Sequence, residues 1–316
     1  MSVKDELRSG SGSASGGGGD APANRADPGP PRRKRRKGRW HTSIGALPFL
    51  VYVALFLLVP AISVVATAFK NGNGQFTMAN FDEAVHGVYL QSFIASIKLS
   101  FASALIASIV GVMAALAVSA TGNRIVRALV TAGSGVFANT GGVPLAFSFI
   151  ATVGNFGVIT TLLSSAGFDL YAHGFSLYSV LGLTIVYQYF LIPLMILIMI
   201  PPIQALRKEW IDASASLGAS RFQFWRWVGI PLLTPPMLAA FIVLFTDAFA
   251  AYATAEALTS GTIPLVPIQL GSLISGNVLA GQANLGDALG AGMIVVVTVA
   301  ALLYAYVQRK ASKWLR

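Results

Sequence analysis

The sequence predicts an all-α membrane protein in which six helices cross the bilayer. Of its 316 residues, 55% are hydrophobic and 11% are charged, whereas soluble domains carry roughly 25% charged residues. The mean hydropathy is +0.68, and the apolar residues come in runs long enough to cross a bilayer, which takes about 20 residues. The positions of the Lys and Arg residues between these runs place nearly all of them on one side of the membrane.

The apolar runs give the predicted spans in order. They lie at about 44–69, 92–120, 135–153, 176–200, 233–257 and 286–307. Glycine and proline interrupt the start of the third run, at Gly133, Gly135, Gly141, Gly142 and Pro144. Because both residue types destabilise an isolated helix, we expect neighbouring helices to support this span.

The basic residues predict the orientation of the spans. Of the 22 Lys and Arg residues, only Lys70 and Lys98 fall outside one side of the six-span arrangement. The others are the ten cations of the N-terminal 39 residues together with Arg124, Arg127, Arg207, Lys208, Arg221, Arg226, Arg309, Lys310, Lys313 and Arg316. Because Lys and Arg are enriched in cytoplasmic loops, both termini are predicted to be cytoplasmic.

Residues 1–40 are predicted to form a disordered, basic cytoplasmic tail, and 41–316 a single transmembrane domain. The tail is rich in Gly, Ser, Pro and charged residues, and it has too few apolar residues to offset the entropy lost on ordering. A net charge of +10 would suggest nucleic-acid binding in a soluble protein. Next to a hydrophobic span, however, a basic run orients the membrane domain, so no nucleic-acid partner is expected.

Composition and motif content argue against several kinds of chemistry. The chain has no cysteine, which excludes disulfides, thiolate metal sites and cysteine nucleophiles. His86 and His173 are expected to be solvated residues of outer loops, so no metal site is predicted. No lysine follows a glycine, so the phosphate-binding loop of an ATPase is absent. Nor do the spans hold a nucleophile with a base, and no catalytic residues or resident cofactors are expected.

The longest predicted internal loop on the cytoplasmic side is 201–231. Pro201 and Pro202 end the fourth span, because proline lacks an amide donor and restricts the residue before it. Residues 207–217 favour a helix, and Gly218 permits a sharp turn after it. Basic and aromatic residues then alternate up to the fifth span, a mixture typical of the lipid headgroup region.

This loop resembles the signature of the permeases of binding-protein-dependent ABC importers: Glu-Ala-Ala, three residues, Gly, nine residues, Ile-x-Leu-Pro. The spacing matches throughout, and the differing residues keep charge, small size or apolar bulk. The matching residues are Asp212, Ala213 and Ser214 for Glu-Ala-Ala, Gly218 for the glycine, and Val228, Ile230 and Pro231 for Ile-x-Leu-Pro. The resemblance implies the type I importer permease architecture with six transmembrane helices.

In that family, the loop forms a coupling helix that lies in a groove of a separate ATPase subunit and moves with it. The resemblance therefore implies an ATPase-coupling set of Glu209, Asp212, Ala213, Ser214, Gly218, Val228, Ile230 and Pro231. It also implies a second permease subunit, an ABC ATPase dimer that carries the ATP and Mg²⁺, and an extracytoplasmic substrate-binding protein. The expected location is the bacterial plasma membrane. An ordinary amphipathic connector is the alternative interpretation of the loop.

A few polar residues inside the spans are candidates for a solute pathway, because ionisable groups are costly there unless they face protein or water. They are Asp247, Tyr252, Glu256, Asn139, Tyr187 and Gln188. In the alternative interpretation, the carboxylates, including Asp287, pair with Lys98 or cap helices. The uncharged side chains would then join helices through hydrogen bonds.

The substrate prediction rests on a second resemblance. Residues 138–150, ANTGGVPLAFSFI, resemble the polyamine (spermidine/putrescine) branch of these permeases, and carboxylates in the spans suit a cationic cargo. Related permeases for iron, thiamine, phosphonate or sulfate are the alternatives within the class. Outside it, a secondary transporter would be expected to contain inverted repeats and a paired broken-helix site, and the sequence indicates neither.

Overall fold

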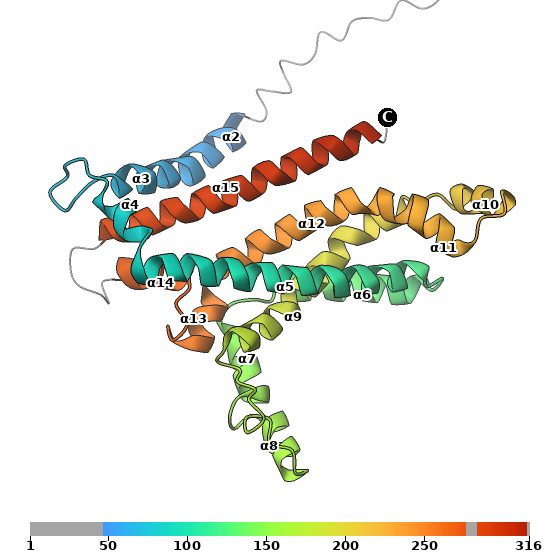
Figure 1. Ribbon diagram of the computed structural model, residues 1–316, viewed down its shortest axis with the longest axis horizontal. Helices are drawn as coiled ribbons and strands as arrows, with labels where there is room; N and C mark the ends of the chain where they lie inside the picture. Colours follow the sequence, from blue (N-terminus) through green and yellow to red (C-terminus); the bar gives the residue numbers. More distant parts are fainter. Residues whose placement is uncertain (1–46, 276–282, 315–316) are drawn as a thin grey trace, which may run out of the picture. The chain divides into compact units, whose positions relative to one another are not determined.

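The computed structural model describes residues 47–275 and 283–314, and these are almost entirely helical (Figure 1). The helices are α2 Leu47–Val53, η1 Ala54–Leu58, α3 Val59–Ala68, α4 Ala79–Ala84, α5 Gly87–Ala120, α6 Arg124–Ala138, α7 Val143–Val153, α8 Val158–Ser165, α9 Val180–Gln204, α10 Lys208–Ser216, α11 Arg221–Phe224, η2 Trp225–Gly229, α12 Ile230–Ala250, α13 Ala253–Thr259, α14 Val266–Ile274 and α15 Ala283–Trp314. These ranges contain no β-strand. The tail predicted over 1–40 lies outside the described residues.

Six helical stretches are long and apolar enough to cross a membrane, which confirms the predicted number of spans. They are Leu47–Ala68, Gly87–Ala120, Val143–Ser165, Val180–Gln204, Arg221–Ala250 and Ala283–Arg309. Which side of the membrane holds the termini stays a prediction.

The third predicted span, 135–153, is wrong as a single helix. α6 ends at Ala138 and α7 begins at Val143. Gly142, between them, has φ +80°, a left-handed conformation that a right-handed helix does not contain. Pro144 lies in the first turn of α7, where its missing amide hydrogen costs nothing. The glycines and proline therefore break the helix rather than only weakening it.

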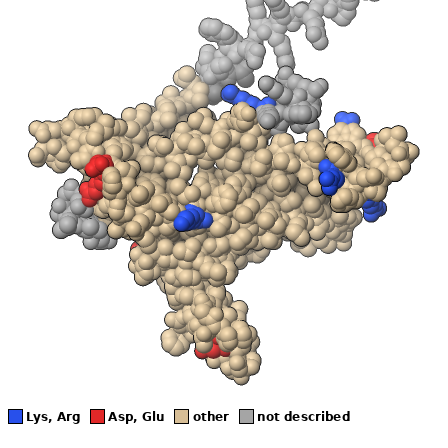
Figure 2. All heavy atoms as spheres, viewed as in Figure 1, with Lys and Arg blue, Asp and Glu red and all other residues tan. Residues whose placement is uncertain are grey.

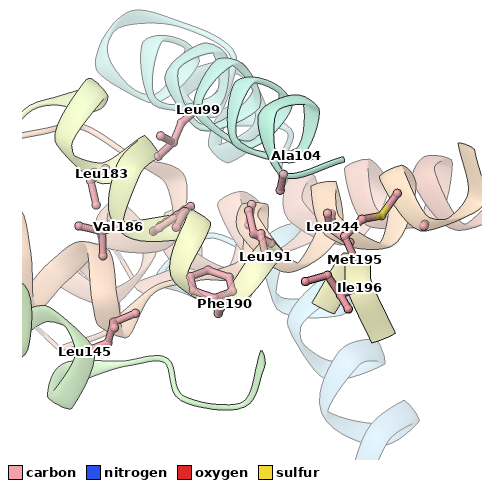
Figure 3. Close-up of a cluster of buried hydrophobic side chains, with 14 of the residues drawn as sticks. Leu99, Ala104, Leu145, Leu183, Val186, Phe190, Leu191, Met195, Ile196 and Leu244 are labelled. Carbon is pink, nitrogen blue, oxygen red and sulfur yellow. The ribbon is translucent and has the colours of Figure 1, made fainter. Parts of the chain in front are cut away.

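The centre of the fold is made by α5, α9 and α12. α9 packs along α5, α6 and α12, while α15 packs against α12, α3 and α14. Figure 3 shows the apolar cluster at this centre, to which α5 contributes Leu99 and Ala104, and α12 contributes Leu244. α7 and α8 differ from the other long segments, because their main contacts are with α13 and with each other, and they run away from the direction of α5, α9 and α12 (Figure 1).

Small residues allow α5 and α9 to approach closely. A Cβ atom on Gly111 would lie 2.5 Å from the Cβ of Met195, so only glycine fits at this crossing. Small and hydroxyl side chains make up much of the buried face of α5, and Gln188 of α9 donates a hydrogen bond to the carbonyl oxygen of Ser103 at 3.2 Å. This pattern is typical of helix pairs in membranes, where close backbone contact replaces the hydrophobic effect as the source of association.

Charged side chains gather at the ends of the molecule. On the face shown in Figure 2, most Lys and Arg side chains lie at the end where Figure 1 places α10 and α11. Carboxylates lie at the opposite end, near α8 and also at the α10 end, and a single cationic side chain lies on the otherwise uncharged surface between the ends. A nearly uncharged band of this kind is what a hydrocarbon layer requires.

Candidate functional site

The 201–231 loop folds as a short exposed helix followed by a sharp turn. α10, Lys208–Ser216, carries Glu209, Asp212, Ala213 and Ser214 of the predicted coupling set, and none of its residues is buried. Glu209 lies in the first turn, where a carboxylate interacts favourably with the positive end of the helix dipole. The small side chains leave the backbone of α10 open to a partner surface.

Gly218 ends α10 through a defined hydrogen-bonding pattern. Its φ is +80°, its amide donates to the carbonyl oxygen of Ala215 at 2.9 Å, and the amide of Ala219 donates to Ser214 at 3.0 Å. These two bonds constitute a Schellman motif, in which the residue at this position adopts the left-handed conformation that favours glycine. The predicted turn at Gly218 is therefore present, and its direction is fixed by the backbone.

The chain after the turn forms one continuous helix into the membrane. Ser220 caps α11, accepting a bond from the amide of Gln223, while the Gln223 side chain accepts a bond from the amide of Ser220. α11 continues through η2 into α12, so the helix runs over Arg221–Ala250. The sequence analysis started the fifth span at 233 and missed this capping box, although Ser-x-x-Gln before an apolar run is its ordinary signal.

The last part of the coupling set lies where η2 joins α12. Val228 belongs to η2, and Ile230 and Pro231 begin α12. A Cβ on Gly229 would lie 2.5 Å from the Trp225 ring, so the ring of Trp225 packs directly on the backbone here. Phe222 and Trp227 are 71% and 72% exposed, which leaves two large aromatic side chains available to lipid or to a partner.

A second site, here called the pathway hollow, lies where two helices are interrupted. Its volume is about 310 Å³, and its lining includes Asn139, Phe190, Asp247, Tyr252 and Thr254. One interruption separates α6 from α7, and the other separates α12 from α13. Both interruptions contribute lining residues to this hollow. Each falls at the end of a long helix, so the absence of a paired broken-helix site within the spans stays a prediction.

The Thr254 side chain joins the two interruptions through hydrogen bonds to Gly142. The Thr254 hydroxyl accepts a hydrogen bond from the amide of Gly142 at 2.8 Å and lies 3.3 Å from the carbonyl oxygen of the same residue. Thr254 is 3% exposed. The hydroxyl therefore gives the Gly142 amide the partner that the break in the helix removes, whereas the Gly142 carbonyl oxygen also accepts a bond from the amide of Ala146.

Three of the six predicted pathway residues line the pathway hollow, namely Asn139, Asp247 and Tyr252. Tyr187 lies behind it, fully buried, and donates a hydrogen bond to the carbonyl oxygen of Ala251 at 3.0 Å. Gln188 joins α9 to α5, which agrees with the alternative interpretation of this residue as a link between helices.

Glu256 does not line the hollow. The fifth span was predicted to extend to 257, but α12 ends at Ala250 and Glu256 belongs to the separate helix α13. Its Oε2 atom is buried without a hydrogen-bond partner. The alternative that the carboxylates pair with Lys98 is not supported, because no ion pair within the described ranges joins Lys98 to Asp247, Glu256 or Asp287.

His86 and His173 are both exposed, as expected of solvated residues, and a carboxylate lies beside His86. The Asp82 carboxylate lies 3.6 Å from the His86 Nδ1 atom, one helical turn away. His173 stacks on Phe168 with ring centroids 4.7 Å apart. In the part of the chain that the structure describes, no three His, Asp or Glu side chains come together as a metal site would require.

Comparison with known proteins bears on the fold. No protein-family model and no curated protein sequence matches the chain. Among solved structures, a chain of a bacterial ABC transporter involved in the import of the acidic polysaccharide alginate aligns with a TM-score of 0.67 and 15% identity, covering 87% of this chain and 96% of that one. A chain of a bacterial alginate ABC transporter in complex with an alginate pentasaccharide-bound periplasmic protein aligns with a TM-score of 0.66 and 16% identity. This alignment covers 87% of this chain and 94% of that one.

A chain of a methionine ABC transporter in inward-facing conformations aligns with a TM-score of 0.49 and 14% identity, covering 70% of this chain and 97% of that one. The two alginate-transporter alignments extend over nearly the whole of the matched chains. Together with the six apolar helices, they establish that this chain has the fold of an ABC importer permease.

Proposed function

We propose that this chain is the transmembrane permease subunit of an ATP-driven importer, and that the 201–231 loop couples it to a separate ATPase. The observation that carries the proposal is the exposed α10 with its fixed turn at Gly218, which holds the importer signature at the matching spacing. An ordinary connector has no need for an unburied helix of small residues with a defined end.

Continuity of the helix supports a mechanical role for the loop. The helix over Arg221–Ala250 is 30 residues long, or about 45 Å at 1.5 Å per residue. One of its ends meets the turn at Gly218, and Asp247 and the pathway hollow lie at the other. A displacement of α10 by an ATPase would therefore reach the hollow through one continuous helix, in which η2, Pro235 and Pro236 interrupt the regular hydrogen bonds.

The chemistry of the hollow favours a cationic solute. Asp247 is the charged residue among those that line it, and Asn139 and Tyr252 add polar groups. The C-terminal ends of α6 and α12 also meet there, and helix C-termini carry partial negative charge. We take a polyamine as the best candidate. The acidic cargo of the structurally similar alginate transporter has the opposite charge, and a likeness at 15% identity extends to the fold alone.

The implied assembly contains a second permease subunit, an ABC ATPase dimer that binds ATP and Mg²⁺, and an extracytoplasmic binding protein, all at a bacterial plasma membrane. One of the similar structures contains a periplasmic protein with bound pentasaccharide, which supports the last of these partners. α6 packs along α9 and follows α5 after a short turn. We therefore infer that α6 makes the third crossing in place of the apolar stretch Val143–Ser165, and that α7 and α8 lie on the extracytoplasmic side.

Secondary transport is the second candidate, because interrupted helices near a carboxylate are typical of ion-coupled carriers. The two functions differ in their energy source. We expect the tagged full-length chain, purified from its native membranes, to bring an ATPase with it. In liposomes, with the binding protein supplied on the opposite side, that complex should take up putrescine only with ATP on the cytoplasmic side. Uptake by the isolated chain, driven by a proton or sodium gradient alone, would overturn the proposal in favour of secondary transport.

A further inference from the structure

A polar hollow lies at the end of the α7–α8 arm, which is defined here as residues 143–171. Its volume is about 500 Å³, and the residues used in this argument are Asn155, Phe156, Thr160, Ser164, Asp169 and Tyr171. It shares no lining residue with the pathway hollow. The arm hollow is therefore a second, separate candidate for ligand binding.

Thr160 gives the first sign of a missing ligand. Its side chain is 6% exposed, it lines the arm hollow, and its Oγ1 atom has no hydrogen-bond partner. A buried hydroxyl without a partner costs about 1–3 kcal/mol. Because Oγ1 is enclosed by protein atoms, a bound group would remove that cost once the side chain rotates to bring this hydroxyl into the hollow.

Asp169 presents a carboxylate in a fixed orientation. Its Oδ1 atom accepts hydrogen bonds from the amides of Tyr171 at 3.0 Å and Ala172 at 3.2 Å. Among the hydrogen bonds of the described residues, none goes to Oδ2. The hollow is not lined by Lys or Arg, and His173 lies against the backbone of Asp169 without lining it. The net charge of the hollow is therefore negative.

The hollow is built on a rigid corner of the chain. The Tyr171 hydroxyl donates to the carbonyl oxygen of Val153 at 2.9 Å, which ties the loop after α8 to the end of α7. A Cβ on Gly157 would lie 2.5 Å from the backbone of Thr152, so the chain between α7 and α8 is tightly packed. The polar groups are thus positioned in advance of binding, which lowers the entropic cost of holding a ligand.

We propose that the arm hollow binds a protonated primary amine. Asp169, Thr160, Ser164 and Asn155 all offer oxygen acceptors, and an ammonium group has three donors and no acceptor. An anion would face the carboxylate without a compensating cation. At the rim, Phe156 is 98% exposed, and an aromatic ring attracts a cation held against its face. A free amine solute and the lysine side chain of a docked protein both provide this chemistry.

The test measures binding of putrescine to the full-length chain in nanodiscs by calorimetry, in an Asp247→Asn background that removes the carboxylate of the pathway hollow. Asp169→Asn keeps the Oδ1 acceptor and should weaken binding by about 10-fold or more, because hydrogen bonds to charged groups are the strong ones. Thr160→Val should also weaken binding, while thermal stability is unchanged or raised. Asp82→Asn, at an exposed carboxylate elsewhere, is the matched control and should have no effect.

Binding of two further ligands is measured. One distinguishes a protein lysine from a free amine as the source of the ammonium group, and the other tests whether a positive charge is needed. Nα-acetyl-lysine amide imitates a protein lysine, and 1,4-butanediol is the uncharged analogue of putrescine. Tighter binding of the lysine mimic assigns the site to a docked protein, whereas tighter binding of putrescine assigns it to a free solute. Equal binding of butanediol and putrescine, or putrescine binding that is unchanged in Asp169→Asn and Thr160→Val, would overturn the proposal. The assay needs neither ATPase nor transport, so its result is independent of the proposed function.

Discussion

Replacing Gly218 with valine tests whether the turn after α10 transmits force. Gly218 has φ +80°, and no atom lies within 4 Å of the position that a Cβ would occupy. The effect of the substitution is therefore one of backbone conformation and not of steric overlap with a neighbour. An L-residue in the left-handed region costs roughly 1–2 kcal/mol, which corresponds to about a 5- to 30-fold loss of the bent conformation relative to alternatives. The two Schellman hydrogen bonds at this turn would be lost with it.

The assay is substrate-stimulated ATP hydrolysis by the reconstituted complex. Gly218→Val should lower the stimulation steeply, while Gly218→Asn should retain most of it, because asparagine tolerates the left-handed conformation. Gly261→Val is the matched control, since Gly261 has φ +77° and equally open surroundings but lies after α13. Full stimulation in Gly218→Val, or an equal loss in Gly261→Val, would refute the reasoning.

Four further predictions follow from the fold and the hollow. Asp247→Asn should reduce uptake of a cationic solute by about 10-fold or more without affecting assembly, as checked by transport in liposomes; unaltered uptake would make the residue structural. Thr254→Val should loosen the pathway hollow and cost roughly 1–3 kcal/mol, because the part-buried amide of Gly142 loses its partner; thermal unfolding measures this, and a wild-type midpoint would contradict it. Gly111→Val should destabilise the pairing of α5 and α9 by roughly 1–3 kcal/mol through overlap with Met195, and undiminished stability would refute the close packing. The chain has no natural cysteine, so Ser164→Cys should react with an impermeant maleimide from outside the cell. Reaction only from the cytoplasmic side would contradict the extracytoplasmic position of α7 and α8.

Much of the fold could be predicted from the sequence because its signals are local. A span is a run of apolar residues, and hydropathy measures it directly. The turn at Gly218 could be predicted for the same reason, since a glycine after a helix of small residues indicates a left-handed end. The Ser220–Gln223 capping box was equally local, and it would have moved the start of the fifth span from 233 back to Arg221.

The pathway hollow could not be predicted in this way, because it depends on residues far apart in the chain. The bond from the amide of Gly142 to Thr254 joins residues 112 positions apart. Gly142 signals a break by itself, but nothing in the sequence around it indicates that the end of α12 lies opposite. The contact of Gln188 could not be predicted for the same reason, since its hydrogen bond to Ser103 requires α9 and α5 to lie side by side.

The most direct measurement of the proposed coupling is the exposure and contact of a single cysteine on the 201–231 loop. Leu217 is 88% exposed at the end of α10, and the natural chain has no other cysteine to label. We predict that Leu217→Cys reacts with an impermeant maleimide only from the cytoplasmic side, and that a bifunctional reagent joins it to the co-purified ATPase in a manner that changes with bound ATP. Reaction from the outside, or the absence of any such crosslink in an assembled complex, would contradict the account.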